Sequence, residues 1–175
     1  MYHRWSEITF IHWRYPPACV RALVPGGLTV ETFDGAAWIG LTPFLMRGVR
    51  FGLPYFWSDM SVDTRDGRTR YRCRRRRPGP AGARCDAEAE RGAPLAERER
   101  DELAHFLTAR YRLFTFVAGR PATAQVEHPP WPLYRSRLIG LDQDLIQAAG
   151  LPICEKPPVL HASPGVPVRV GMWTW

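Results

Sequence analysis

The sequence has almost no lysine and no long apolar run. Lys156 is the single lysine among 24 basic residues. No uninterrupted apolar stretch approaches the roughly 20 residues that a membrane helix needs. The opening "MYHRWSEITF" lacks the basic and apolar regions of a signal peptide. We therefore expect a soluble, cytoplasmic protein that does not associate with a membrane.

Several motifs that mark catalytic or metal sites are also missing. The sequence has no CxxC, HxH, HxxxH or HExxH pattern, no G-x-S-x-G, and no glycine-rich phosphate loop. The four cysteines are far apart, which predicts reduced thiols, although Cys73 and Cys85 could face each other across a hairpin. The sequence therefore predicts no metal and no cofactor, and it leaves the catalytic residues unknown.

Proline and glycine are abundant, with 17 and 15 residues among 175. A chain of this length fits one domain, and so many turn formers favour short elements over a helical bundle. Of the net charge of +7, a share of +5 comes from residues 61–100, which include the run "RYRCRRRRPGP". The basic character therefore belongs to one segment and not to the whole surface.

Alternating β-branched and aromatic residues predict a mainly β chain of the α+β class. A strand is expected over 8–15, and three hairpins are expected at Asp34-Gly35, Asp66-Gly67 and Ala118-Gly119. A weaker strand is expected near 83–92, and two short strands close the chain. The main helix is expected at about 97–110, and two short helices at about 17–23 and 142–150, the latter with Asp142 as N-cap and Gly150 as its stop. The pattern predicts a curved antiparallel sheet or an incomplete barrel.

Several ordered motifs resemble one family. A strand ends in His12-Trp13, a P-x-G-L motif follows at Pro25–Leu28, and a "DGAAWIG…PF" block spans Asp34–Phe44. "GLPYFWSDMSV", "LAHFLTARYRLF" and "VEHPPWPL" follow in the same order. Together these segments resemble the YqjF-like proteins, the family of unknown function numbered 2071. The resemblance covers nearly the whole chain and implies a single domain over 1–175.

The chain departs from that family in its middle. Typical members carry a central block between the "RGVR" and "LPY" strands, with E-x-N-x-R-T-Y and G-x-x-F-x-S-L-D motifs. Here Arg50 runs almost directly into "FGLPYFW", and neither motif is present. The resemblance therefore implies a domain that is shortened near residues 50–52.

The family is placed with acetoacetate-decarboxylase-like folds, in which a curved sheet surrounds a small-molecule cavity. That decarboxylase uses a Schiff-base lysine whose pKa is lowered by a neighbouring cation. Lys156 instead follows Glu155 in "CEKPP", and a carboxylate would raise its pKa. The resemblance thus implies the fold and not the decarboxylase chemistry.

Histidines and tryptophans in the family motifs are the candidate site residues. A neutral or protonated imidazole can shuttle protons near neutral pH, and aromatic walls are common in ligand pockets. The alternative is that these side chains are core residues, and that the prolines after His128 only stiffen a turn. The ligand-pocket candidates are His12, Trp38, His128, Trp131 and His161.

The leading hypothesis is a small-molecule-binding, β-barrel-type domain with no identified reaction, whose ligand is small and apolar or a carboxylate. The alternative is a non-catalytic interaction module or a degenerate remnant, which the shortening favours over an enzyme. Sheet edges left exposed would favour a homo-oligomer. A weaker alternative is nucleic-acid binding through the hairpin with arginines at 70–77. Two features argue against it: on a strand these arginines are divided between the two faces, and Asp59, Asp63 and Asp66 on the other arm could pair with them.

Overall fold

The computed structural model describes residues 1–48, 58–75, 83–117 and 119–175. Within them the chain forms one ten-stranded, open antiparallel sheet and three short α-helices. The elements in chain order are β1 (Tyr2–Tyr15), α1 (Pro17–Arg21), β2 (Ala37–Leu41), β3 (Leu45–Arg47), β4 (Ser58–Arg65), β5 (Arg68–Arg75), β6 (Arg84–Pro94), a 3-10 turn (Glu97–Glu99), α2 (Glu102–Thr108), β7 (Arg112–Val117), β8 (Arg120–Glu127), β9 (Tyr134–Gln143), α3 (Leu145–Ala148) and β10 (Val159–Val170).

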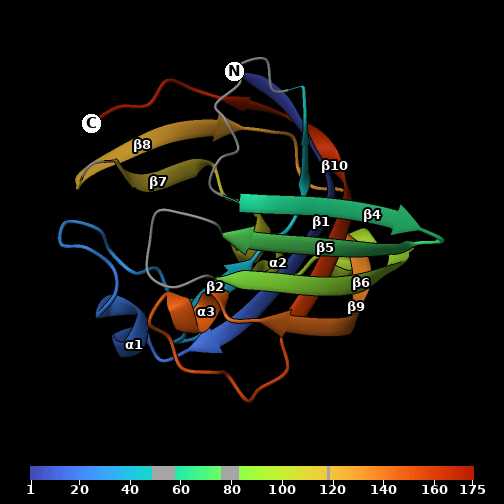
Figure 1. Cartoon of the computed structure of the whole chain (residues 1–175), viewed down its shortest axis with the longest axis horizontal. Helices are drawn as coiled ribbons and strands as arrows, with labels where there is room; N and C mark the ends of the chain where they lie inside the picture. Colours follow the sequence, from blue (N-terminus) through green and yellow to red (C-terminus); the bar gives the residue numbers. More distant parts are fainter. Residues whose placement is uncertain (49–57, 76–82, 118) are drawn as a thin grey trace.

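The sheet is strongly curved. Its main path runs β2-β1-β10-β9-β6-β5-β4, while β3 pairs with β1, and β8 pairs with both β7 and β10 (Figure 1). Although β5 and β1 are far apart along this path, the Tyr71 hydroxyl lies 2.9 Å from that of Thr9 and donates to the carbonyl of Glu7. The sheet therefore folds back over its own interior, which confirms the predicted mainly β, curved antiparallel architecture.

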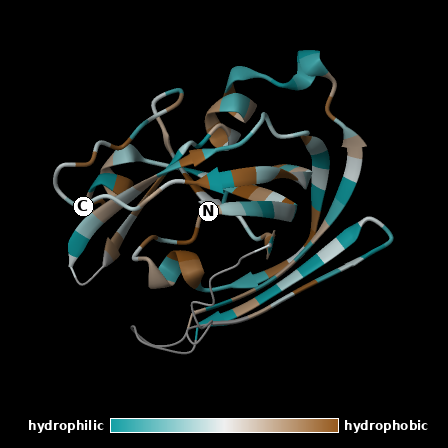
Figure 2. Ribbon diagram, turned by 90° about the horizontal axis from the view of Figure 1, so that it is seen from above, coloured by the Kyte–Doolittle hydropathy of each residue, from teal (hydrophilic) through white to brown (hydrophobic). Residues whose placement is uncertain are grey.

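Strand β1 is buried on both faces. Ile11, Trp13 and Tyr15 point into the curve of the sheet, where they pack with Tyr71 and Ala87. Side chains at the intervening positions point to the opposite face, because successive residues of a strand alternate. There Ile8 and Phe10 form a second core with α2, β8 and Trp131. Figure 2 shows hydrophobic residues gathered toward the middle of the molecule and hydrophilic ones common on the outer hairpin.

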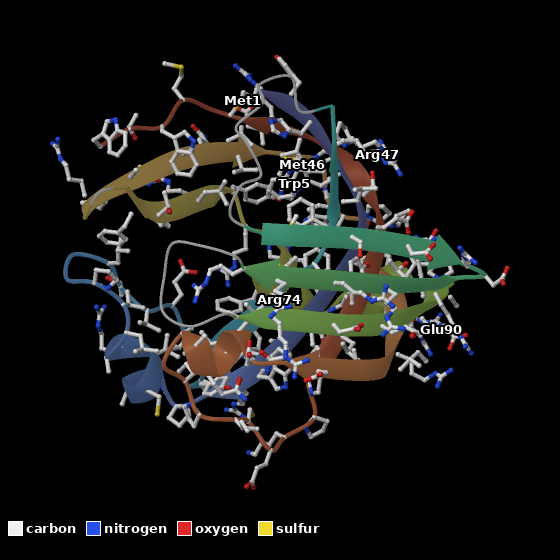
Figure 3. All side chains as sticks on the ribbon, in the orientation of Figure 1. Met1, Trp5, Met46, Arg47, Arg74 and Glu90 are labelled. Carbon is white, nitrogen blue, oxygen red and sulfur yellow. The ribbon has the colours of Figure 1, made fainter. Side chains whose placement is uncertain are left out.

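The pairing of β1 with β10 contains a kink. Ser6 pairs with Gly165 and Ile8 with Ser163, but the intervening Glu7 has a positive φ of 49°. Gly165 has φ 115°, and a Cβ placed on it would lie 2.0 Å from the carbonyl oxygen of Trp5. The prediction of two short closing strands is therefore wrong, because "PGV" bends one long strand. Figure 3 shows Trp5 beside Met46 at the kinked end, where β3 also pairs with β1.

Local turn chemistry places most of the other elements. The hairpins at Asp66-Gly67 and near Gly119 are confirmed, with Asp66 and Gly67 both at positive φ. The turn at Asp34-Gly35 also forms, closed by a bridge between Phe33 and Ala36. The predicted strand before this turn is wrong, because the described residues that lead into it form only that bridge and no strand. A turn is also expected at "PGPAG", residues 78–82, which lie outside the described residues.

The helices are shorter than predicted. Asp101 accepts a hydrogen bond from the backbone N–H of Ala104 at 2.7 Å and starts α2 there, so the predicted helix at 97–110 covers a separate 3-10 turn and a seven-residue helix. Asp142 is not an N-cap, because it lies in β9 and pairs with Arg84. Gly150 ends α3 with φ 91°, as predicted.

The contact at Gly165 gives a stability test. The Gly165→Ala variant must move the Trp5 backbone and hold alanine at φ 115°, so we expect its free energy of unfolding to fall by about 2–4 kcal/mol. Gly140→Ala is the matched control, because a Cβ there meets nothing within 4 Å. Urea denaturation followed by fluorescence measures both. Equal midpoints for the two variants would contradict the kinked geometry.

Candidate functional site

Two of the predicted histidines lie on neighbouring strands and on one face of the sheet. His12 is on β1, opposite Gly40 of β2, and the imidazole fills the space that a side chain at Gly40 would need: a Cβ there would lie 2.6 Å from His12 Cδ2. His161 is on β10, directly opposite Phe10, and the Phe10 ring stacks on His12 at 6.1 Å. Strand register thus brings His12 and His161 together on the α2-covered side.

Burial keeps both imidazoles neutral. His12 is 7% exposed, and burial, followed by the charges of His161 and Arg110, lowers its pKa to about 4. Burial also lowers the pKa of His161, although the Asp101 carboxylate acts in the opposite direction. The Nδ1 atoms of both histidines lack a hydrogen-bond partner among the described residues, as does Nε1 of Trp38.

Trp131 is a core residue. It is 6% exposed, its ring meets Phe10 edge-on at 5.4 Å, and its indole N–H donates to the carbonyl of Thr108 at 3.1 Å. This bond joins the proline-rich segment to the last residue of α2. Trp131 therefore links α2 to β1 through its hydrogen bond with Thr108 and its contact with Phe10.

His128 supports the segment that follows α2. Its Nδ1 lies 2.8 Å from the carbonyl of Pro129, and its Nε2 lies 3.3 Å from that of Arg110. Its ring stacks on Tyr111 at 4.8 Å and lies 4.9 Å from that of Trp131. His128 thus sets the course of the backbone at 109–111 and the orientation of Tyr111.

A groove of about 680 Å³ lies between the segment before β2 and the start of β7. Of the five candidates, Trp38 alone lines it, together with Val24, Leu28 and Tyr111. Arg110 crosses the groove to Glu31 at 2.6 Å and lies 4.3 Å from the Phe106 ring centroid. The groove residues that the sequence reasoning missed are Arg110, Tyr111 and Arg112, whose one signal was the "ARYR" that ends the predicted helix.

Lys156, which the sequence argues against as a Schiff-base lysine, does not line the groove beside Trp38. Lys156 and Glu155 lie with Arg14 along a separate groove of about 500 Å³. Among the described residues, no group of three histidines, cysteines or carboxylates could hold a metal ion. None of the helices in the described residues is long and apolar enough to cross a bilayer.

The arginine-rich hairpin is largely neutralised by neighbouring carboxylates. Arg70 binds Asp86 through two hydrogen bonds at 2.9 and 2.7 Å, and Arg72 lies 3.4 Å from the same carboxylate. Similar pairs join Arg68 to Glu90 and β6 to β9. These partners lie on β6 and β9, whereas Asp63 pairs with Arg65 of its own strand, and the side chain of Asp59, another expected partner, lies outside the description. Arg74 and Glu90 mark opposite ends of this surface in Figure 3, and Arg76 and Arg77 lie outside the described residues.

Comparison with known proteins identifies relatives of unknown activity. The chain is 25% identical to the uncharacterized protein YqjF of Bacillus subtilis (strain 168), over an alignment of 210 positions that covers 92% of this chain and 86% of the relative. No solved structure matches. The model of the DUF2071 family, described as an uncharacterized conserved protein, matches residues 2–53 and 48–167. These two matches cover most of the sequence, and the chain therefore belongs to the DUF2071 family.

Proposed function

We propose that this protein binds a small molecule with an apolar body and a carboxylate in the groove beside Trp38. The observation that carries the proposal is the composition of the groove wall, where Trp38, Tyr111 and Phe114 occur together with Arg110 and Arg112. A volume of about 680 Å³ lies within the range of roughly 300–1,000 Å³ that is usual for ligand sites.

The two groove arginines have different roles. The guanidinium of Arg110 is held by Glu31 and stacks on Phe106, so it joins the two walls. Arg112 is exposed, and within the described part of the chain it makes no ion pair. A guanidinium binds a carboxylate through paired, charge-assisted hydrogen bonds. We therefore assign ligand recognition to Arg112 and the shape of the site to Arg110.

The buried His12 lies near Arg110 of the groove, whose charge acts on it. A neutral His12 avoids adding a second positive charge near Arg110, and its ring occupies the space above Gly40. His12 is therefore buried next to the groove but does not line it. Binding without catalysis fits a site in which neither histidine lines the groove.

A shortened centre is part of the proposal. The family model matches in two segments that meet at residues 48–53, and the alignment with YqjF has more positions than this chain has residues. An apolar cleft of about 230 Å³ separates residues 41–44 from the β4–β5 hairpin. These facts support a family member that lacks a central block, and the binding role that we propose for it rests on the groove beside Trp38.

The shortening has a direct test. Sequencing the gene and its transcript around the codons for Arg50 and Phe51 should give one continuous frame with no intervening coding block. A longer intact frame at this point would contradict the proposed short form, and enzyme assays would then belong on the longer protein.

Ligand binding is tested with 2-naphthoate, which has an apolar ring system and a carboxylate. We expect Trp38→Ala and Arg112→Gln each to weaken its binding about tenfold in calorimetric titration, since each removes roughly 1.4 kcal/mol of contact. Phe116→Ala is the control, because Phe116 is an exposed aromatic residue that does not line the groove. Uncharged 2-naphthalenemethanol should bind the wild type and Arg112→Gln equally. If all three variants bind naphthoate alike, the groove is not the site.

Stability should depend on the protonation of His12. The unfolded chain takes up a proton near pH 6.5, whereas the folded protein does so only near pH 4. Because the unfolded state binds more protons in this interval, the free energy of unfolding should fall by about 2–3 kcal/mol from pH 7 to pH 4.5. His161, whose pKa is also lowered, adds to the fall.

Urea denaturation across this pH range measures the effect. His12→Gln should flatten the profile, because glutamine does not titrate. His105→Gln, at an exposed position of α2, should leave the profile unchanged. A His12→Gln profile as steep as that of the wild type would show that His12 is not buried as a neutral imidazole.

A further inference from the structure

Two cysteines lie face to face inside the curved sheet. Cys73 of β5 and Cys85 of β6 are direct partners in the antiparallel register, and both are thiols. Directly opposed residues of antiparallel strands have Cα atoms about 4.5–5.5 Å apart, which lies within the range of about 4.4–6.8 Å found for disulfides. The register therefore places the two cysteines within the range of separations that a disulfide spans.

Both cysteines belong to the interior face of the sheet. They pack with the core cluster that contains Ile11 and Tyr71. Cys85 is buried, whereas Cys73 is half-buried, and both line the apolar cleft beside β4. A small reagent therefore reaches Cys73 first, and Cys85 is placed to react second.

Arginines and a carboxylate, Asp86, lie next to the two cysteines along their strands. A second groove of about 390 Å³ is lined by both cysteines together with Arg72, Arg74 and Arg84. Arg72 and Arg84 also make ion pairs, with Asp86 and Asp142, on the same surface. Because neighbours along a strand point to opposite faces, these ion pairs lie on the outer face, and the thiols are reached from the apolar cleft on the inner face.

We propose that Cys73 and Cys85 form a dithiol–disulfide pair that exchanges with a low-molecular-weight disulfide of the glutathione type. The Cys73 thiolate attacks one sulfur of the small disulfide, which forms a mixed disulfide and releases one thiolate. Cys85 then loses its proton and attacks Sγ of Cys73, which releases the second thiolate. The two protein thiols are oxidised, the small disulfide is reduced to two thiols, and these take up the two protons.

The order of the steps follows from the surroundings of the two sulfur atoms. Burial, followed by the charges of Cys73 and nearby carboxylates, raises the pKa of Cys85 to about 11. Cys85 is therefore protonated at neutral pH, and its attack is the slow step that speeds up as the pH rises. Cys19 on α1 and Cys154 before β10 lie outside the strand pairs and have no comparable placement.

The test uses a chain with Cys19→Ser and Cys154→Ser, so that the pair supplies the only thiols. The protein is equilibrated in buffers of reduced and oxidised glutathione, the remaining thiols are alkylated, and the intact mass is measured. We expect an oxidised form that carries neither alkyl groups nor glutathione. In that form the melting temperature should rise by about 5–10 °C, because the bond closes a short loop.

Two further variants separate the steps. Adding Cys85→Ser should trap one glutathione on Cys73, and adding Cys73→Ser should slow glutathione attachment at least tenfold. A peptide map of oxidised wild-type protein should contain Cys73 joined to Cys85, which does not depend on how the variants fold. The proposal is wrong if both thiols of the parent variant remain alkylatable in excess oxidised glutathione, or if the variant accumulates two glutathione adducts.

Discussion

The structure depends on one antiparallel pairing, that of β1 with β10. It joins Tyr2–Arg169 at one end to His12–Val159 at the other, and the opposite edge of β1 carries β2 and β3. Since β1 is also buried on both faces, its alternating side chains supply both cores. One face holds His12 beneath α2 and the groove, and the other faces the dithiol. A disturbance of this pairing would therefore reach both proposed sites.

The parts of the fold that the sequence predicted are those set by local chemistry. Asp66-Gly67 accepts the positive φ that a tight hairpin requires, and Gly150 does the same at the end of α3. By contrast, β9 was not predicted, because its sequence "YRSRLIGLDQ" places charged residues on an exposed face and its partner β6 is distant in the chain. Likewise, Pro164-Gly165 resembles a turn in sequence and becomes a kink because β1 pairs along both sides of it.

The candidate site was predictable only in part. Strand alternation puts His12, Trp38 and His161 on one face, and the family motifs drew attention to each of them. The groove itself depends on the approach of residues 24–31 to the start of β7, which no local pattern encodes, and so Arg110 and Arg112 were overlooked. In the proline-rich segment, the sequence singled out Trp131, but its hydrogen bond to the carbonyl of Thr108 in α2 depends on tertiary packing that no local pattern encodes.

The Tyr71 hydroxyl has a mechanical consequence. Strands β9 and β10 pair only at His161–Arg135 and Ala162–Tyr134, whereas β6 and β9 pair along most of their length. The sheet therefore consists of two plates that are well paired internally and are joined by this short pairing, with β4, β5, β6 and β9 in one plate and β1, β2, β3 and β10 in the other. Across the interior, the hydrogen bonds from Tyr71 to β1 close the angle between the plates. The ion pair between Arg91 of β6 and Glu7 of β1 adds a second link at the same place, so the curvature of the sheet is held by side chains that are far along the chain from the short β9–β10 pairing.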